Sequence, residues 1–328
     1  GDHGGAIGYL VGQENRGLEY MFVMMNAARF AVGQQGIAVA ERAYQKAVQY
    51  ARDRVQSRPV DGSLNTAAPI IHHPDVKRML MTMRAYTEGC RAMAFVAAAA
   101  LDAAHAHPDA AVRKQNQAFY EFMVPLVKGY STEMSLEVTS LGVQVHGGMG
   151  FIEETGAAQH YRDAKILTIY EGTTAIQAND LVGRKTARDG GATVRAICEQ
   201  IQDTEAQLAA RSSDAAKAVG KRLAAGRQAL LDAAAFIAGG AKGSPNAVFA
   251  GSVPYLMLAG NVMAGWQMAR SLIAAEDQLA AGVEPDFMRA KINTARFYAD
   301  HILSKAPGVR DSIVDGAAGV TEMALDAF

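Results

Sequence analysis

One carboxylate stands where it could act as a base. Glu171 follows the largely apolar run 166–169 and precedes Gly172. A carboxylate at the end of an apolar run is expected to be partly desolvated, which makes it a better base near neutral pH. Taken alone, the same residues also describe a helix end with a solvated glutamate, because helices commonly end at a glycine.

A glycine-rich turn precedes this glutamate in the chain. Gly147, Gly148 and Gly150 follow Gln144 within a few residues. Glycine tolerates positive φ and lets other groups approach the backbone closely, so such a turn marks a bend or a ligand contact. An Arg-Asp pair at positions 162–163 lies between the turn and Glu171.

The ordered set resembles the signature of the acyl-CoA dehydrogenase family. There, a Gln-x-x-Gly-Gly-x-Gly turn precedes Arg-Asp-Ala and then Ile-Tyr-Glu-Gly-Thr. The matching residues here are Gln144, Gly147, Gly148, Gly150, Arg162, Asp163, Ala164, Ile169, Tyr170, Glu171, Gly172 and Thr173. The resemblance implies FAD-dependent oxidation of an acyl-CoA thioester to its trans-2-enoyl form.

In the family a carboxylate removes the α-proton while the β-hydrogen leaves as hydride to the flavin, and this base matches Glu171. Some branches place the base one residue before an arginine of the first helix. That position is Ala28 here, before Arg29, so Glu171 is the remaining candidate. Its backbone N–H would help bind the thioester carbonyl, where enolate charge develops.

The resemblance also assigns residues to the two ligands. The positions matching the substrate contacts are Arg29, Asn26 and Tyr170, although the family usually has an acidic residue in place of Asn26. The positions matching the FAD contacts are Arg54, Gln56, Gln144, Gly147, Gly148 and Thr173. Of these, the glutamine and glycines of the turn match positions that reach the FAD of a neighbouring subunit. Ser57, Arg58 and Ala175 depart from the family pattern around these sites.

Composition narrows the remaining function classes. The chain has 328 residues, 50% of them hydrophobic, which is enough for a substantial core. Its formal net charge of −1 gives no electrostatic footprint for nucleic acid or an anionic membrane. The sequence holds no uninterrupted apolar run of about eighteen residues and no zinc-like Cys/His spacing, so we expect neither a membrane span nor a metal. We expect the chain to be cytoplasmic. The resemblance implies a homodimer or homotetramer, with electron-transfer flavoprotein as its electron acceptor.

Helical periodicity predicts an all-α chain. The predicted helices and connections are a helix at about 18–54, a loop at 55–70, a helix at 75–106, a helix at 110–142 bent at Pro125, a helix at 173–186, a linker at 187–192, and helices at 193–212, 214–238, 246–277 and 284–305. The resemblance implies that residues 18–187 form the family's C-terminal four-helix bundle and that residues 193–328 form a second, helical extension.

Residues 1–17 resemble the last part of the family's middle β-domain. The N-terminal helical domain and most of that β-domain are then absent from this chain. The extension resembles that of a branch with a long C-terminus, which includes enzymes acting on methylthiopropionyl-CoA. Two alternatives stay open: a truncated helical assembly module without activity of its own, and an acyl-CoA oxidase, which shares the base and the flavin.

Overall fold

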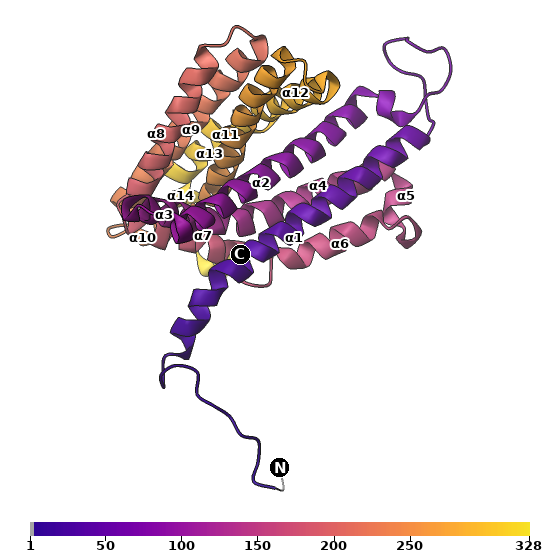
Figure 1. The fold of residues 1–328 in the computed structure, drawn as a ribbon. Helices are drawn as coiled ribbons and strands as arrows, with labels where there is room; N and C mark the ends of the chain where they lie inside the picture. The colour runs from indigo at the N-terminus through magenta and orange to yellow at the C-terminus, as the bar shows by residue number, and fades with distance from the viewer. Residues whose placement is uncertain (1–2) are drawn as a thin grey trace.

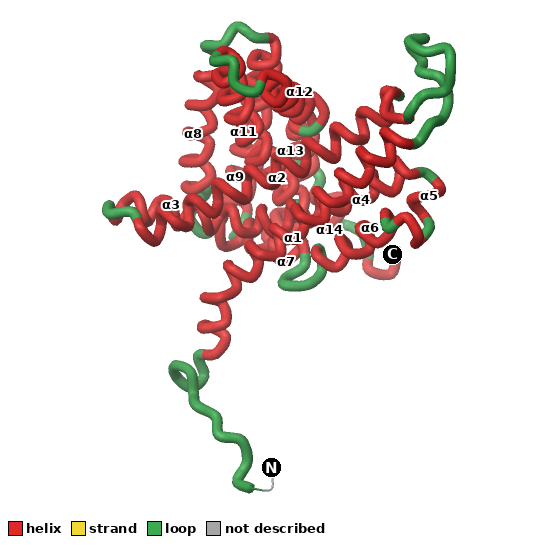
Figure 2. The backbone as a smooth tube through the Cα atoms, turned by 45° about the vertical axis from the view of Figure 1, so that its right-hand side comes forward, coloured by secondary structure: helices red, strands yellow, loops and turns green. Residues whose placement is uncertain are grey.

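The computed structural model describes residues 3–328, except the side chains of Phe22 and Val23. Within this range the regular elements are helices, and we find no strand (Figures 1 and 2). The all-α prediction is therefore confirmed. Residues 3–16 form no regular element and are exposed, and residues 1–2 of the predicted β-domain remnant lie outside the described residues.

The first half of the chain is a bundle built around two long helices. Its α-helices are α1 (Gly17–Asp53), α2 (Pro74–Ala106), α3 (Ala110–Pro125), α4 (Ser131–His146), α5 (Gly148–Phe151), α6 (Ala157–Leu167) and α7 (Thr174–Val182). Helix α1 packs against α2, α4 and α6, while α2 packs against α3 and α4. In Figure 1 helices α1, α2, α4 and α6 run alongside one another, with the α1–α2 loop and α5 at the same end of the bundle.

The predicted single helix at 110–142 is two helices joined by a π-helical turn, Leu126–Tyr130. Pro125 causes the break, because proline removes a backbone donor and crowds the preceding helical turn. A second π-helical turn, Gly183–Ala187, follows α7. Helix α6 lies in a stretch for which the periodicity predicted no helix.

The second half is a helical extension centred on α11. Its α-helices are α8 (Ala192–Ala209), α9 (Asp214–Gly240), α10 (Pro245–Ala250), α11 (Ser252–Ala280), α12 (Pro285–His301), α13 (Ala306–Val314) and α14 (Ala317–Thr321). The predicted helix at 246–277 is interrupted at Gly251. Helix α11 contacts α9, α12 and α13 within the extension and α2 and α7 of the bundle. Every residue from 258 to 269 is buried, as expected of a helix enclosed on all sides.

Short 3₁₀ turns complete the described elements. They are η1 (Ile70–His72), η3 (Glu153–Thr155), η5 (Leu303–Lys305) and η6 (Leu325–Ala327). One continuous core joins the bundle to the extension. Among residues 3–328 we find no helix with the length and apolarity that crossing a membrane requires.

Candidate functional site

The glycine turn ends α4 and faces open space. Gly147 has φ +60° and ψ −140°, a backbone conformation that other residues rarely adopt. A Cβ atom on Gly147 or Gly148 would meet no atom within 4 Å. Gly150 differs, because its Cβ would lie 2.2 Å from the carbonyl oxygen of Val143. Gly150 thus allows close packing against α4, whereas Gly147 and Gly148 border open space.

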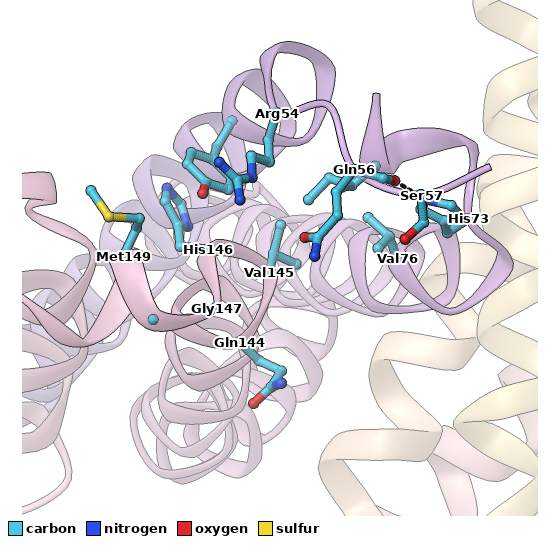
Figure 3. A pocket seen from close by; sticks show the side chains of 13 residues that line it. Arg54, Gln56, Ser57, His73, Val76, Gln144, Val145, His146, Gly147 and Met149 are labelled. Atoms are coloured by element: carbon cyan, nitrogen blue, oxygen red, sulfur yellow. Dashed lines mark hydrogen bonds between the residues drawn. The ribbon is translucent and has the colours of Figure 1, made fainter. Parts of the chain in front are cut away.

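A cavity of about 630 Å³ opens beside this turn (Figure 3). Its lining comes from the end of α1, the following loop, the start of α2 and the end of α4: Tyr50, Arg54, Gln56, Ser57, Ile70, His73, Val76, Gln144, Val145, His146, Gly147, Gly148 and Met149. The structure therefore brings together all the predicted cofactor residues except Thr173.

The lining of this cavity suits an anionic ligand. It contains Arg54, His73 and His146 and, among the lining residues described, no carboxylate. His146 is buried and stacks on Tyr50 with ring centroids 4.3 Å apart. Burial lowers the pKa of His146, so this ring is neutral near pH 7 and Arg54 carries the fixed positive charge. A planar guanidinium matches the geometry of phosphate oxygens.

Backbone hydrogen bonds fix the loop that presents Arg54 and Gln56. The N–H of Ile70 donates to the carbonyl oxygen of Arg54 at 2.8 Å, and the N–H of Gln56 donates to that of Ala68 at 3.0 Å. The Nε2 atom of His73 lies 2.8 Å from the carbonyl oxygen of Gln56. The two ends of the loop are thus joined at the rim of the cavity, which limits where both side chains can reach.

Glu171 lies in the loop between α6 and α7, where its backbone has φ +55°. Its side chain is exposed, so the expected partial desolvation is wrong for this chain. The reason is that Ile166 and Ile169 of the preceding run are themselves exposed and do not cover the carboxylate. An exposed position leaves the carboxylate accessible to a ligand.

The predicted substrate residues are Tyr170 in this loop and Asn26 and Arg29 on α1. The Tyr170 hydroxyl donates to Oε1 of Gln35 on α1. Asn26 is half-buried, while Arg29 is buried and its Nη1 atom lies 3.2 Å from Oδ2 of Asp180 on α7. The Nε atom of Arg29 is buried without a hydrogen-bond partner. Arg29 thus joins α1 to α7 within the chain, and its contact with CoA stays a prediction.

Thr173 belongs to the Glu171 loop and is remote from the cavity. Its Oγ1 atom accepts a hydrogen bond from the N–H of Ile176 at 3.3 Å and caps α7. The next residue, Thr174, bonds through its hydroxyl to Glu133 in the first turn of α4. The cavity lies at the other end of α4, and a rise of 1.5 Å per residue puts the two ends about 20 Å apart. The predicted cofactor residues therefore fall into two groups within one chain.

Sequence reasoning missed four residues of these regions: Tyr50, His73 and His146 at the cavity and Lys128 beneath the Glu171 loop. Lys128 is the one charged residue in the run 122–130, Phe-Met-Val-Pro-Leu-Val-Lys-Gly-Tyr, and its side chain is fully buried. The signal for Lys128 in the sequence was a single charged residue within an apolar run. The described residues contain no group of three or more His, Cys, Asp or Glu side chains arranged to hold a metal ion.

Residues 15–185 match the family model described as the acyl-CoA dehydrogenase C-terminal domain. The chain belongs to the acyl-CoA dehydrogenase family. Residues 194–324 match a second model, described as acetyl-CoA dehydrogenase C-terminal like. The family resemblance of the sequence is thereby confirmed.

Two curated relatives place the chain within this family. It is 55% identical to 3-methylmercaptopropionyl-CoA dehydrogenase of Ruegeria pomeroyi over 96% of this chain and 53% of the relative. It is 36% identical to a broad-specificity linear acyl-CoA dehydrogenase of Mycobacterium tuberculosis over 100% of this chain and 56% of the relative. The chain thus spans about half the length of these acyl-CoA dehydrogenases.

A solved structure shares the fold. The crystal structure of an acyl-CoA dehydrogenase from Bacillus anthracis, complexed with FAD, aligns with a TM-score of 0.71 at 19% identity. The alignment covers 95% of this chain and 52% of that one. The aligned region therefore includes both the bundle and the extension of this chain.

Proposed function

We propose that this chain is the C-terminal part of an FAD-dependent acyl-CoA dehydrogenase and that Glu171 is its base. The observation that carries the proposal is the placement of Glu171. It stands in the signature order of the acyl-CoA dehydrogenase family, on an exposed loop where its backbone has φ +55°. We further propose residues 18–187 as the bundle domain and residues 193–328 as the extension.

The proposed reaction removes one proton and one hydride from the acyl chain. The Glu171 carboxylate takes the α-proton, and the electron pair of the broken α-C–H bond forms the double bond of the trans-2-enoyl product as the β-hydrogen leaves. Bound FAD supplies the acceptor for that hydride. The Glu171 N–H donates to the thioester carbonyl oxygen, where negative charge develops. Tyr170, Asn26 and Arg29 are the proposed substrate side of the site.

The cavity residues fit one end of FAD. Arg54 offers a guanidinium for the pyrophosphate, and the open space beside Gly147 and Gly148 lets a ligand approach the backbone. Thr173 lies at the opposite end of α4 and does not line the cavity of its own chain. We propose that each FAD is held between two subunits, with the glycine turn from one and Thr173 from the other. This arrangement requires a homodimer or homotetramer.

The proposed substrate is a short thioether acyl-CoA of the 3-methylthiopropionyl type. The support is the identity of 55% to a relative named for that substrate. We propose electron-transfer flavoprotein as the acceptor and the cytoplasm as the compartment. The test is anaerobic mixing of the full-length flavoprotein with 3-methylthiopropionyl-CoA and with butyryl-CoA. Bleaching of the flavin band and formation of the 2-enoyl product by the thioether substrate support the proposal, and an unchanged spectrum with both substrates contradicts it.

The same preparation distinguishes a dehydrogenase from an oxidase. A dehydrogenase passes its electrons to electron-transfer flavoprotein, whereas an oxidase turns over with dissolved oxygen and releases peroxide. We expect turnover to require the flavoprotein acceptor. Rapid peroxide release in its absence would instead identify an oxidase.

For the 328-residue chain by itself, a second function is favoured by one observation. Glu171 is exposed, so this chain does not enclose its own base. We propose that, alone, it is a helical assembly module without activity. The test is equilibrium dialysis of the purified chain against FAD, followed by addition of an acyl-CoA. We expect the acyl-CoA to cause no bleaching of a bound flavin. Bleaching of a bound flavin would overturn this proposal.

A further inference from the structure

The side chain of Lys128 is buried directly beneath the Glu171 loop. Its Nζ atom donates to the carbonyl oxygen of Leu167 at 2.9 Å and to that of Gly172 at 2.6 Å. Leu167 is the last residue of α6, and Gly172 directly follows Glu171. One ammonium group therefore holds the loop on both sides of the proposed base. Hydrogen bonds from a charged donor are the stronger kind.

The loop that Lys128 holds has a backbone that needs support. Glu171 has φ +55° and Gly172 has φ +87°. A non-glycine residue at positive φ is uncommon and persists where its surroundings fix it. The Nε2 atom of Gln177, also fully buried, lies 3.4 Å from the carbonyl oxygens of both Glu171 and Gly172. These long contacts supplement those of Lys128.

Two neighbouring helices pack closely against the π-helical turn that carries Lys128. Helix α1 approaches this turn at Gly33, where a Cβ atom would lie 2.2 Å from the carbonyl oxygen of Val127. On the other side, a Cβ on Gly260 of α11 would lie 2.2 Å from the ring of Tyr130. The turn is thus enclosed between the bundle and the extension, and Lys128 has little freedom to withdraw.

The extension also bonds to the turn. The Tyr130 hydroxyl donates to Oδ1 of Asn261 on α11 at 2.7 Å and lies 3.1 Å from the hydroxyl of Tyr298 on α12. Both tyrosines are almost fully buried. The extension therefore supports the residue next but one to Lys128, which gives this part of the chain a physical connection to the base.

We propose that Lys128 is a positioning residue that fixes the backbone of Glu171, with the extension supporting the turn that carries it. The inference rests on the proposed role of Glu171 as the base. Lys128 itself touches neither substrate nor the reacting atoms. It fixes the direction of the Glu171 N–H and of the Cα–Cβ bond from which the carboxylate extends, because both follow from the backbone between Leu167 and Gly172.

The first test is amide hydrogen exchange of the 328-residue chain, which does not depend on activity. The Thr174 N–H donates to the carbonyl oxygen of Thr168 at 3.1 Å and so reports on closure of the loop. In Lys128→Met we expect its exchange to be about 10- to 100-fold faster, as loss of hydrogen bonds from a charged group predicts. The Gly150 N–H, bonded to the carbonyl oxygen of Gly147 at the other end of α4, should keep its rate.

The matched control is Lys185→Met. Lys185 lies in the second π-helical turn, and it donates a hydrogen bond to Glu121 on α3 at 2.8 Å and not to the Glu171 loop. We expect it to leave the exchange of Thr174 unchanged. Equal acceleration of the Thr174 and Gly150 amides in Lys128→Met would mean general destabilisation and would overturn the proposal. If Lys128→Met does not fold, Lys128→Gln tests the same contacts, because its shorter and uncharged side chain cannot replace both Lys128 bonds. We expect a smaller local acceleration in Lys128→Gln, and an unchanged Thr174 rate there would contradict the proposal.

The second test is turnover of the full-length protein. We expect Lys128→Met to lower kcat by about 10- to 100-fold with KM and FAD content unchanged, because a base displaced by about 1 Å loses rate on this scale. A rise in KM with unchanged kcat would contradict a positioning role. Failure of the proposed function can be distinguished from failure of this inference. Full activity in Glu171→Gln would show that Glu171 is not the base, whereas faster local exchange in Lys128→Met would still show that Lys128 holds the loop.

Discussion

At one end of α4 the backbone beside Gly147 faces open space, whereas at the other end Lys128 fills the space beneath the Glu171 loop. Both ends carry signature residues of the family, and both contain residues at positive φ. The open end has room for a ligand against the chain, while at the closed end Lys128 bonds to the backbone on both sides of Glu171. The binding and the proton transfer that we propose would thus use different local structures at the two ends of the same helix.

The largest expected effect concerns the buried charges near the closed end. Asp180 accepts hydrogen bonds from Arg29 and Arg184. Asp180→Ala would leave the buried Arg29 guanidinium unpaired, so we expect the free energy of unfolding to fall by about 3–5 kcal/mol. Urea unfolding of the 328-residue chain measures this. The control is Asp75→Ala, which removes an exposed ion pair with Arg78 and should cost less than about 1 kcal/mol.

A loss below about 1 kcal/mol in Asp180→Ala would show that the closed end does not depend on paired buried charge. The ion pairs at the two positions would then be equivalent, and the comparison would fail at this point.

The next effect is a pH dependence of stability from Lys128. Burial lowers the pKa of Lys128 from its ordinary value of 10.5 to about 8, and Arg29 lowers it too, against opposing contributions from Glu133 and Glu171. Between pH 8 and 10.5 the unfolded chain therefore binds more protons than the folded chain. The Lys128 contribution to the free energy of unfolding then rises with pH across this window, by up to about 3 kcal/mol.

The measurement is urea unfolding from pH 7 to 10 for the wild-type chain and for Lys128→Met. Subtracting the two curves removes other groups, such as Cys90, whose pKa burial raises to about 12 and which destabilises the fold as pH rises. We expect wild type to gain stability over the variant above pH 8. A constant difference would show that the Lys128 ammonium is solvated.

The smallest effects separate strain from binding at the open end. Gly147→Ala forces a side chain into a glycine conformation and should lower the free energy of unfolding by about 1–3 kcal/mol. Gly148→Ala meets no atom within 4 Å and has no positive φ, so stability should change by less than about 1 kcal/mol. Its added methyl group lies beside the cavity, so FAD content of the full-length protein should fall. Unchanged FAD content in Gly148→Ala would contradict the proposed contact between this glycine and FAD.

The bundle could be predicted from the sequence because apolar residues repeat at helical spacing over long helices such as α1 and α2. Local departures were harder to see. The π-helical turn after Pro125 and the break at Gly251 are small changes in backbone geometry that leave the apolar pattern intact. The short helix α6 buries Ala157, Ala164 and Leu167, of which two are alanines, and it exposes Ile166, so its buried face gives a weak apolar pattern in the sequence.

The candidate site divides in the same way. The family resemblance led to five of the residues that line the cavity and to Glu171. It did not lead to Lys128, because its partners lie 39 and 44 residues away and are backbone carbonyls, which leave no trace in residue type. The exposure of Glu171 was also hidden, since an apolar run in sequence does not show whether it covers its neighbour.

The most direct measurement is the rate of flavin reduction by acyl-CoA in the full-length protein, with wild type, Glu171→Gln and the control Glu154→Gln mixed anaerobically. Glu154 is exposed in η3 and lies outside the base loop. We predict that Glu171→Gln slows reduction by about 10²- to 10⁴-fold with FAD content unchanged, while Glu154→Gln reduces at the wild-type rate. Wild-type reduction by Glu171→Gln would contradict the assignment of the base and, with it, the function proposed for the closed end of α4.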